Sequence, residues 1–366
     1  MTKHVVFNGK FLTAPPTGVH RVAGELILSL DRLLAGGAVG DPGWTGELIC
    51  PPDVVRSFPL DRIARTKKGP LVWQLWEQFQ LPLECRAQLL VNLCNLAPIA
   101  VEGAITMIHD AQVFISPESY SRSFGSWYRF ALPQIGSRAF RIVTVSNFSR
   151  GRLAAYGVAP LSAISVIHNG VDHILRVAAD DAVLARLGLA YEPYVVALAN
   201  TQKHKNIGLL LNAFGRPAMK RLKLVLVGSA EAADFVAEGF TPPDNVIFAG
   251  RVSDAEMRAL LEGAVCLAFP STTEGFGLPP LEAMALGTPA VVAPCGALPE
   301  VCADAAIYAP ADDPAAWEAE LLGLLEDPRR RRRMGQVGRR HASTYTWERA
   351  AWELLGVIDE AVRAEA

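Results

Sequence analysis

The sequence predicts an α/β protein made of two doubly wound domains, each built on a parallel sheet. The chain has 366 residues, which is more than one ordinary domain holds. Short β-branched runs alternate with longer amphipathic segments in both halves, which is the pattern of β-α-β units. Hydrophobic residues make up 51% of the chain and charged residues 20%, so two buried cores can form and a disordered chain is excluded.

The strand-like runs form two series. In the first half an amphipathic helix is expected over 19–34, and the runs lie at residues 4–8, 47–51, 104–110 and 141–146. In the second half the strand-like runs lie at residues 193–199, 223–228, 245–250, 265–270 and 289–294. Helices are expected between these runs, over 205–214, 254–262 and 280–286. The second series is the more regular, and a doubly wound sheet binds its ligand at the carboxyl ends of its strands.

Turn signals divide the chain between the two series. The boundary is expected near residues 168–181, where Asn169-Gly170 marks a turn and the periodicity lapses. A last amphipathic helix is expected over 347–363. The basic run at 327–340 is interpreted as a helix with a solvated face, with contact to an anionic surface as the alternative.

Charge and composition narrow the classes of function. The formal net charge of −2 gives no general attraction to nucleic acid. The six cysteines form no Cys-x-x-Cys pair and are expected to be buried thiols in a reducing cytosol. No secretory signal opens the chain, and no apolar run of about 20 residues is uninterrupted, so a soluble, cytoplasmic protein is expected.

The most informative stretch is 265–294, which predicts a strand, a glycine-bearing loop, a helix and a second strand. Gly275 and Gly277 lie in the loop, and Pro279 and Pro280 open the helix, where a missing N–H costs little. A helix N-terminus presents free N–H groups and the positive end of the helix dipole. This arrangement suits a phosphate group.

Two carboxylates indicate a sugar beside that phosphate. Glu274 lies at the tip of the loop, and Glu282 is expected in the first turn of the helix. A carboxylate repels a bare phosphate, so both side chains are expected to accept hydrogen bonds from sugar hydroxyls, with the diphosphate of a nucleotide-sugar between them. The alternative for Glu282 is structural, since an acidic group in a first turn complements the helix dipole.

A cation is needed to neutralise a leaving diphosphate, and the sequence has no Asp-x-Asp motif to hold a metal. Lys203 and Lys205 follow the strand expected at 193–199 and are the candidates, because lysine binds phosphate as a point charge. The alternative for both is an exposed polar loop. Asn206 is expected to cap the helix that follows.

Here a family resemblance becomes clear. The segment EGFGLPPLEAMALGTPAVV resembles the Glu–seven residues–Glu motif of the retaining glycosyltransferases of family four, and NTQKHKN resembles their lysine-bearing donor loop. The resemblance continues, in family order, through TGVHRVAGELILSL, LWEQFQLP, MIHDAQVF, VTVSNFSR and VIHNGVD, and so covers nearly the whole chain. It implies the GT-B fold, with two Rossmann-like doubly wound domains facing each other across a cleft. The acceptor-binding domain would span 1–172, with 347–366 packing back on it, and the donor-binding domain 173–346.

The resemblance also implies roles in the donor site. Glu282 would bind the nucleotide ribose, Glu274 would hold hydroxyls of the transferred sugar, and Lys205 would neutralise the diphosphate. Many family members have an arginine near Asn200, and Lys203 would replace it here. Further donor contacts, largely through the backbone, would come from Arg251, Phe276, Gly277 and Leu278.

In the N-terminal domain the resemblance implies two more contacts. Gly18 would let the backbone approach the phosphates, and His109 would face the reacting sugar and act with Lys205 and Glu274 in catalysis. The alternative for His109 is packing or capping after a strand. The alternatives for His20 are contact with the acceptor and exposure to solvent.

The expected reaction is transfer of a hexose with retention of anomeric configuration, without a metal or another cofactor. The motifs most resemble those of bacterial mannosyltransferases of O-antigen or exopolysaccharide assembly, which favours GDP-mannose as the donor. The acceptor would be a glycan or a polyprenyl-diphosphate-linked sugar at the inner face of the plasma membrane. A basic and aromatic patch would touch that membrane, unless its aromatic residues pack in the core; it consists of Arg56, Arg62, Arg65, Lys67, Lys68, Trp73, Trp76 and Phe79.

Other classes of protein are weighed against this one. A GT-B nucleotide-sugar epimerase would turn over the donor without an acceptor, and a non-catalytic protein would only bind it. The intact Glu274, Glu282 and Lys205 argue against both. A Rossmann dehydrogenase is disfavoured, because no Gly-x-Gly-x-x-Gly follows the first strand of either domain.

Overall fold

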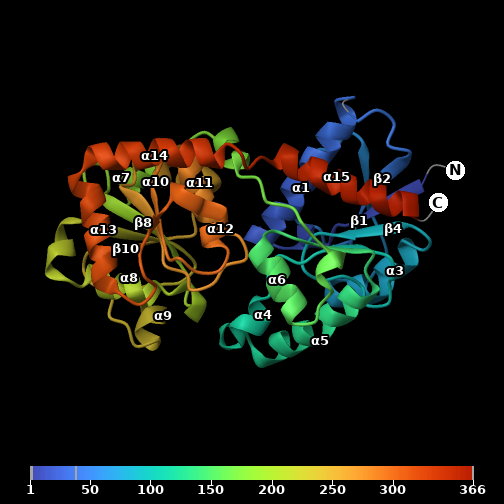
Figure 1. Cartoon of the computed structure of the whole chain (residues 1–366), viewed down its shortest axis with the longest axis horizontal. Helices are drawn as coiled ribbons and strands as arrows, with labels where there is room; N and C mark the ends of the chain where they lie inside the picture. The colour runs from blue at the N-terminus through green and yellow to red at the C-terminus, as the bar shows by residue number, and fades with distance from the viewer. Residues whose placement is uncertain (1–2, 38, 365–366) are drawn as a thin grey trace. The chain divides into compact units, whose positions relative to one another are not determined.

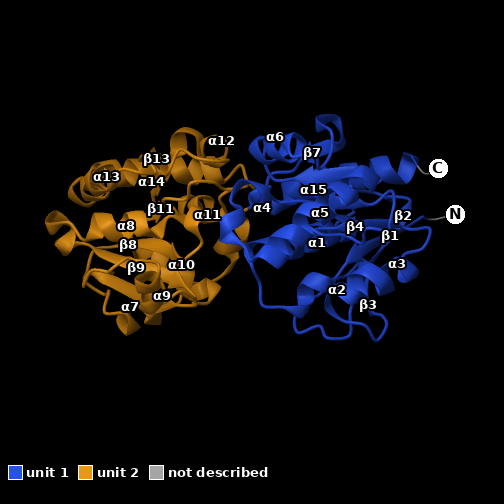
Figure 2. Cartoon of the chain, turned by 90° about the horizontal axis from the view of Figure 1, so that it is seen from below, with its two compact units in different colours: residues 1–170, 346–366 blue, residues 171–345 orange. Residues whose placement is uncertain are grey.

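A computed structural model describes residues 3–37 and 39–364. The chain divides into two compact units (Figure 2). Unit 1 comprises residues 1–170 and 346–366, and unit 2 comprises residues 171–345. Each unit has a parallel sheet covered by helices (Figure 1), so the expected pair of Rossmann-like domains is confirmed.

Unit 1 contains a seven-stranded sheet in the order β3-β2-β1-β4-β5-β6-β7, with all neighbours parallel. From β1 the chain adds β2 and β3 on one side of the sheet, and it then adds β4 to β7 on the other side of β1. The topological switch point therefore lies between β1 and β4. The strands are β1 (Lys3–Asn8), β2 (Trp44–Cys50), β3 (Ile63–Lys67), β4 (Leu89–Asn92), β5 (Ile105–Met107), β6 (Arg141–Thr144) and β7 (Ile164–Val166).

The helices of unit 1 include one from the far end of the chain. They are α1 (Gly18–Ala35), α2 (Trp73–Leu75), α3 (Leu81–Glu84), α4 (Gln112–Ile115), α5 (Arg122–Arg138), α6 (Asn147–Ala155) and α15 (Trp347–Ala364). A π-helical turn, Trp76–Gln80, joins α2 to α3. Helix α15 packs against α1 (Figure 1), and Asp359 Oδ1 accepts a hydrogen bond of 3.0 Å from Nε1 of Trp44.

Unit 2 contains a six-stranded parallel sheet in the order β10-β9-β8-β11-β12-β13. Its switch point lies between β8 and β11. The strands are β8 (Tyr194–Ala199), β9 (Lys223–Gly228), β10 (Val246–Gly250), β11 (Cys266–Phe269), β12 (Ala290–Val292) and β13 (Ile307–Tyr308). The helices are α7 (Ala182–Arg186), α8 (Ile207–Phe214), α9 (Ala232–Ala237), α10 (Asp254–Gly263), α11 (Leu278–Leu286), α12 (Leu298–Cys302), α13 (Pro314–Glu326) and α14 (Pro328–Ala342).

The core of unit 2 explains why its strands are nearly continuous apolar runs. Both faces of a doubly wound sheet are covered, so alternation is lost and β-branched residues dominate. Val195, Leu224 and Cys266 are fully buried, as is Trp317 of α13. The basic run forms α14, whose Gly335 and Gly338 are buried while most of its arginines are exposed. The expected helix with a solvated face is confirmed.

Two helices begin two residues away from the expected start. Helix α11 begins at Leu278, two residues before the expected start, because the left-handed Gly277 ends the loop there. Helix α8 begins at Ile207, since Lys203–Lys205 form a separate 3-10 turn.

Candidate active site

The site expected in unit 2 lies at its switch point. Strands β8 and β11 are neighbours, and their carboxyl ends lead into the turn at Lys203–Lys205 and the loop at 270–277. These two segments are bonded directly, because the backbone N–H of Thr272 donates to the carbonyl oxygen of His204 over 2.8 Å. The fold therefore brings the lysine turn and the glycine loop to one place at the sheet edge.

Two predicted site residues form an ion pair there. Nζ of Lys205 lies 2.7 Å from Oε1 of Glu274, and the two side chains are 21% and 12% exposed. Nζ of Lys205 also lies 5.8 Å from the centroid of the Phe269 ring. The pair places one cation and one carboxylate side by side, which matches a diphosphate next to sugar hydroxyls.

The glycine loop ends in a left-handed glycine beside this pair. Gly277 has φ 104° and ψ 55°, which favours glycine, and an added Cβ would lie 2.6 Å from Cδ2 of Leu298. Helix α11 starts at the next residue, Leu278, with no side-chain cap, so the N–H of Leu278 and the positive end of the helix dipole can meet an anion, whereas Pro279 and Pro280 have no N–H. Phe276 is buried and meets Tyr345 edge to face, which fixes the loop.

Glu282 lies farther along α11 than the sequence indicates. It is the fifth residue of a helix that starts at Leu278, and the first turn contains no acidic residue. The expectation of a first-turn position is therefore wrong, and helix-dipole complementarity is weakened as an explanation, because that effect falls off within one turn. Instead, Oε1 of Glu282 lies 2.9 Å from Nε2 of His173, a partner that sequence reasoning missed.

The remaining donor-site candidates lie in surface turns of unit 2. The Oδ1 of Asn200 accepts the backbone N–H of Gln202, which shapes the lysine turn. Lys203 is exposed in that turn, and Arg251 is exposed just after β10. Asn206 does not cap α8 as expected: it is left-handed, and its Nδ2 donates instead to the carbonyl oxygens of Pro270 and Ala311.

Unit 1 contains the other two predicted residues. Gly18 opens α1, and an added Cβ there would have nothing within 4 Å, so the packing of the fold does not require glycine at this position. His109 follows β5 and is 6% exposed. Its Nε2 lies 2.9 Å from the Leu93 carbonyl oxygen, so this nitrogen carries the proton and donates it. Burial lowers the pKa of His109 to about 4, and the imidazole is neutral at neutral pH.

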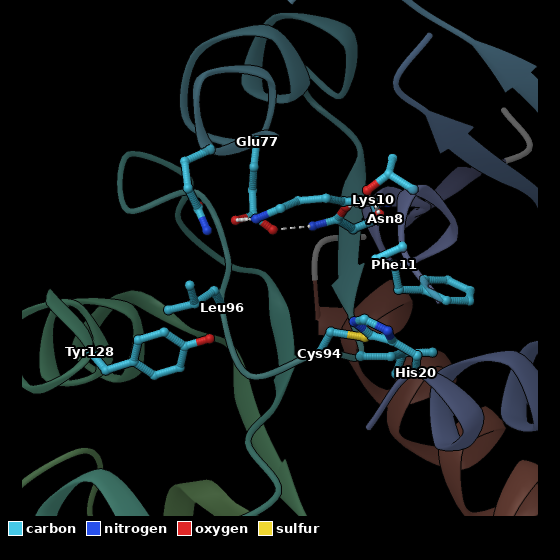
Figure 3. Close-up of a pocket in the computed structure, with 12 residues that line it drawn as sticks. Asn8, Lys10, Phe11, His20, Glu77, Cys94, Leu96 and Tyr128 are labelled. Carbon is cyan, nitrogen blue, oxygen red and sulfur yellow. Dashed lines mark hydrogen bonds and ion pairs between the residues drawn. The ribbon is translucent and has the colours of Figure 1, made fainter. Parts of the chain in front are cut away.

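A pocket at the switch point of unit 1 was not expected from the sequence (Figure 3). Nζ of Lys10, just after β1, lies 2.7 Å from Oε2 of the buried Glu77, which belongs to the π-helical turn. Asn8, the last residue of β1, donates its Nδ2 to Oε1 of Glu77 over 2.9 Å. His20 also lines this pocket and is not fully exposed to solvent.

The expected basic and aromatic patch is only partly present. Trp76 is fully buried, and Arg56 binds the carbonyl oxygens of Phe11 and Ala14, so both belong to the fold rather than to a patch. Trp73 and Phe79 are 73% and 63% exposed. Together with three exposed aliphatic residues on the same helical segment they form what we call the apolar face: Val72, Trp73, Leu75, Phe79 and Leu83.

Within residues 3–37 and 39–364, no three His, Cys, Asp or Glu side chains gather as a metal site requires. In the same part of the chain, none of the helices combines the length and the apolar character that crossing a membrane demands.

Comparison with known families gives two matches. The family described as Glycosyl transferases group 1 matches residues 186–341, and the one described as Glycosyltransferase Family 4 matches residues 95–174. O-antigen chain mannosyltransferase B of Escherichia coli is 31% identical over 268 residues, which cover 70% of this chain and 70% of that protein. D-inositol 3-phosphate glycosyltransferase of Segniliparus rotundus is 30% identical over 311 residues, which cover 81% of this chain but 65% of that protein.

Solved structures share the fold. Sucrose-phosphate synthase from Thermosynechococcus elongatus superposes with a TM-score of 0.75 at 20% identity, over 100% of both chains. Anabaena Alr3699/HepE, solved in complex with UDP and glucose, gives a TM-score of 0.72 at 17% identity over 98% of this chain and 100% of that one.

Proposed function

The chain belongs to the glycosyltransferases of group 1 and family four, and on that premise we propose that it transfers a hexose from a nucleotide-sugar. Mannose from GDP-mannose is the favoured donor, and the product would belong to a cell-surface polysaccharide. The observation that carries the proposal is the Lys205–Glu274 pair beside the uncapped N-terminus of α11. The relative named O-antigen chain mannosyltransferase B supports the choice of sugar and product.

The proposed transfer retains the anomeric configuration. The bond from the anomeric carbon to the diphosphate oxygen breaks, and the oxygen of an acceptor hydroxyl bonds to the same face of that carbon. The hydroxyl proton passes to the departing diphosphate oxygen, so the products are a glycoside and a nucleoside diphosphate. Lys205, the N–H of Leu278 and the positive end of the α11 dipole stabilise the negative charge that grows on the diphosphate. With these groups in place we propose that the transfer needs neither a metal nor another cofactor.

The other donor contacts follow from the same site. Glu282 would accept hydrogen bonds from the ribose through the oxygen that does not contact His173. Glu274 would hold hydroxyls of the sugar, and the exposed Lys203 and Arg251 would meet the diphosphate and the base from their turns.

The acceptor we propose is a glycan or a polyprenyl-diphosphate-linked sugar at the inner face of the plasma membrane. The apolar face supports contact with the membrane, because large apolar side chains are exposed along a single helical segment. The exposed Arg62, Arg65 and Lys67 precede that segment, and basic groups attract anionic lipid headgroups.

The test is a thermal-shift panel of nucleotide-sugars on the wild type and on Glu282→Ala, followed by a transfer assay with the donor that binds. We expect GDP-mannose to raise the melting temperature of the wild type but not of the variant, and transfer to a mannoside to follow. Donor turnover to an isomer without any acceptor would favour the epimerase. Donor binding without turnover would favour a binding protein, and no response to any nucleotide-sugar would overturn the proposal.

A further inference from the structure

We propose that Asn95 is a positioning residue of the transfer reaction, and that it acts by holding His109 in place. The inference rests on the proposed function and on the role expected of His109, which is to meet the reacting sugar. Asn95 follows β4 and His109 follows β5, and these two strands are neighbours in the sheet of unit 1. Both residues therefore lie at the carboxyl ends of strands, where doubly wound sheets bind their ligands.

Asn95 is the central residue of a tight turn. The backbone N–H of Leu96 donates to the carbonyl oxygen of Cys94 over 2.7 Å, and Asn95 between them has φ 65°. A hydrogen bond of this span around a residue with positive φ makes a γ-turn of the rare and strained kind. The turn is tied to the sheet, because the N–H of Asn95 donates to the carbonyl oxygen of Met107 over 2.9 Å. Such strain persists only where the surrounding structure fixes it, and it clusters at functional sites.

The turn and the residue before it hold His109 at two points. Oδ1 of Asn95 accepts the backbone N–H of His109 over 2.8 Å. The carbonyl oxygen of Leu93 accepts a hydrogen bond of 2.9 Å from Nε2 of the same histidine. On the other side, Oγ of Ser149 donates to the carbonyl oxygen of His109 over 3.1 Å. Residues 93–95 thus set both the backbone position of His109 and the direction of its ring.

These contacts decide which ring atom of His109 is left for a ligand. Nε2 carries the proton and donates it to Leu93, and the ring is neutral, so Nδ1 keeps its lone pair. Among the residues that the structure describes, none donates a hydrogen bond to Nδ1. Nδ1 is therefore an acceptor in a fixed position, which is the chemistry that a sugar hydroxyl requires.

The conformation of Asn95 and its contact with His109 can be separated by substitution. A positive φ is adopted most easily by glycine, and it strains a residue that has a Cβ. Asparagine tolerates this conformation better than most residues do, and its short carboxamide reaches the N–H of His109. Glycine at this position would relax the backbone and remove only the contact with His109.

The test uses the full chain and initial-rate kinetics with a nucleotide-sugar that the protein turns over. For Asn95→Gly we expect kcat to fall about tenfold or more, because a displaced reactive group is costly. KM for the donor should change less than about twofold, since the groups proposed to bind the diphosphate and the ribose belong to unit 2. Asn95→Asp keeps the acceptor oxygen and should stay within about threefold of the wild type at pH 8, where His109 remains neutral beside a carboxylate.

A double-mutant cycle asks whether Asn95 acts through His109. Asn95→Gly is introduced into the wild type and into His109→Gln, and the two ratios of kcat are compared. We expect the fall to shrink to less than about twofold in the His109→Gln background, because the residue that Asn95 positions is gone. A merely structural role would lower kcat by the same factor in both backgrounds.

The ring nitrogens of His109 give a second measurement, which needs no activity. In protein with ¹⁵N-labelled histidine, the signals that are lost in His109→Gln belong to this residue. The wild type should show a protonated Nε2 and a bare Nδ1. Asn95→Gly should shift both signals toward a mixture of tautomers, because His109 is no longer held against Leu93.

Ala87→Gly is the matched control. Ala87 also has a positive φ, of 56°, and it is exposed just before β4 in the same unit. Glycine relaxes the backbone there in the same way. The kinetic constants and the His109 signals of this variant should keep their wild-type values.

The outcomes distinguish this inference from the proposed function. Absence of transfer by the wild type with every nucleotide-sugar contradicts the proposed function. If the wild type transfers the sugar and Asn95→Gly keeps its kcat, or loses it equally in both backgrounds, Asn95 is not a positioning residue. Wild-type activity of His109→Gln, or unchanged His109 ring signals in Asn95→Gly, would also overturn the inference.

Discussion

His173 and Glu282 are joined by a hydrogen bond of 2.9 Å between Nε2 and Oε1, and the histidine side chain is 4% exposed. The contact links the start of unit 2 to the middle of α11. It occupies one carboxylate oxygen and orients the other.

We therefore expect His173→Ala to raise KM for the donor about tenfold while kcat changes little, because the interaction lost is one of ground-state binding. His173→Gln keeps a side-chain N–H and should restore most of the donor affinity. Initial-rate kinetics with varied donor would measure both constants. A fall in kcat at constant KM would mean that His173 does not act through ribose binding.

Lys205 is expected to matter most in the chemical step. Lys205→Ala removes the cation beside the leaving diphosphate and leaves Glu274 without its partner, so kcat should fall on the order of a hundredfold. Lys203→Ala is the comparison, since Lys203 is exposed in the same turn, and its effect should be severalfold at most. Single-turnover rates at saturating donor would measure this difference. Equal rates for the two variants would contradict the assigned role of Lys205.

The buried His109 predicts a pH dependence of stability. Its pKa is about 4 in the folded chain and 6.5 in the unfolded one, so the unfolded state takes up a proton first as the pH falls. The stabilisation present above pH 6.5 is therefore lost between pH 6.5 and 4, and amounts to about 3 kcal/mol.

Urea unfolding of the wild type and of His109→Gln at pH 7.5, 6 and 5 would measure the effect. The free energy of unfolding of the variant should fall less across this window. Parallel curves for the two proteins would show that His109 titrates normally.

The apolar face predicts binding to vesicles. Sedimentation with vesicles that contain anionic phospholipid should recover the wild type, and salt should weaken the binding, because basic residues contribute. The double variant Leu75→Asp/Phe79→Asp should lose most of this binding, since both side chains are exposed and point away from the core. Tyr191→Asp is the control, because Tyr191 is 99% exposed in unit 2. Equal loss in the control would argue against the apolar face.

Prediction from sequence worked best where local pattern and structure coincide. The five strands of unit 2 that were expected all form, because each is an apolar run covered on both faces. Strands β3, β4, β7 and β13 were missed. β3 is a charged edge strand, β7 and β13 have only three and two residues, and the four residues of β4 are followed by an irregular stretch with polar residues. Helix α5 was missed too, since Pro133 interrupts its pattern.

The site residues, too, were predictable from the sequence only where they form a local pattern. Glu274, Gly277 and Lys205 occur in short motifs, so the sequence indicates them directly. Glu77 becomes notable only through its ion pair with Lys10, which lies 67 residues away in the sequence and follows β1, an inner strand of the sheet. A contact set by strand order leaves no local signal.

Unit 1 is built from two segments that are far apart in the sequence, and this has a consequence for biosynthesis. Unit 2 is one continuous stretch and can close as soon as residue 345 has left the ribosome. Unit 1 cannot fold completely at that point, because α15 has not yet been translated. Helix α1, with its buried Leu26 and Leu30, packs against α15, and Trp44 donates a hydrogen bond to Asp359 of α15. The first half of the nascent chain therefore keeps an uncovered apolar surface while the second half is translated, and a truncation before residue 346 would make that exposure permanent.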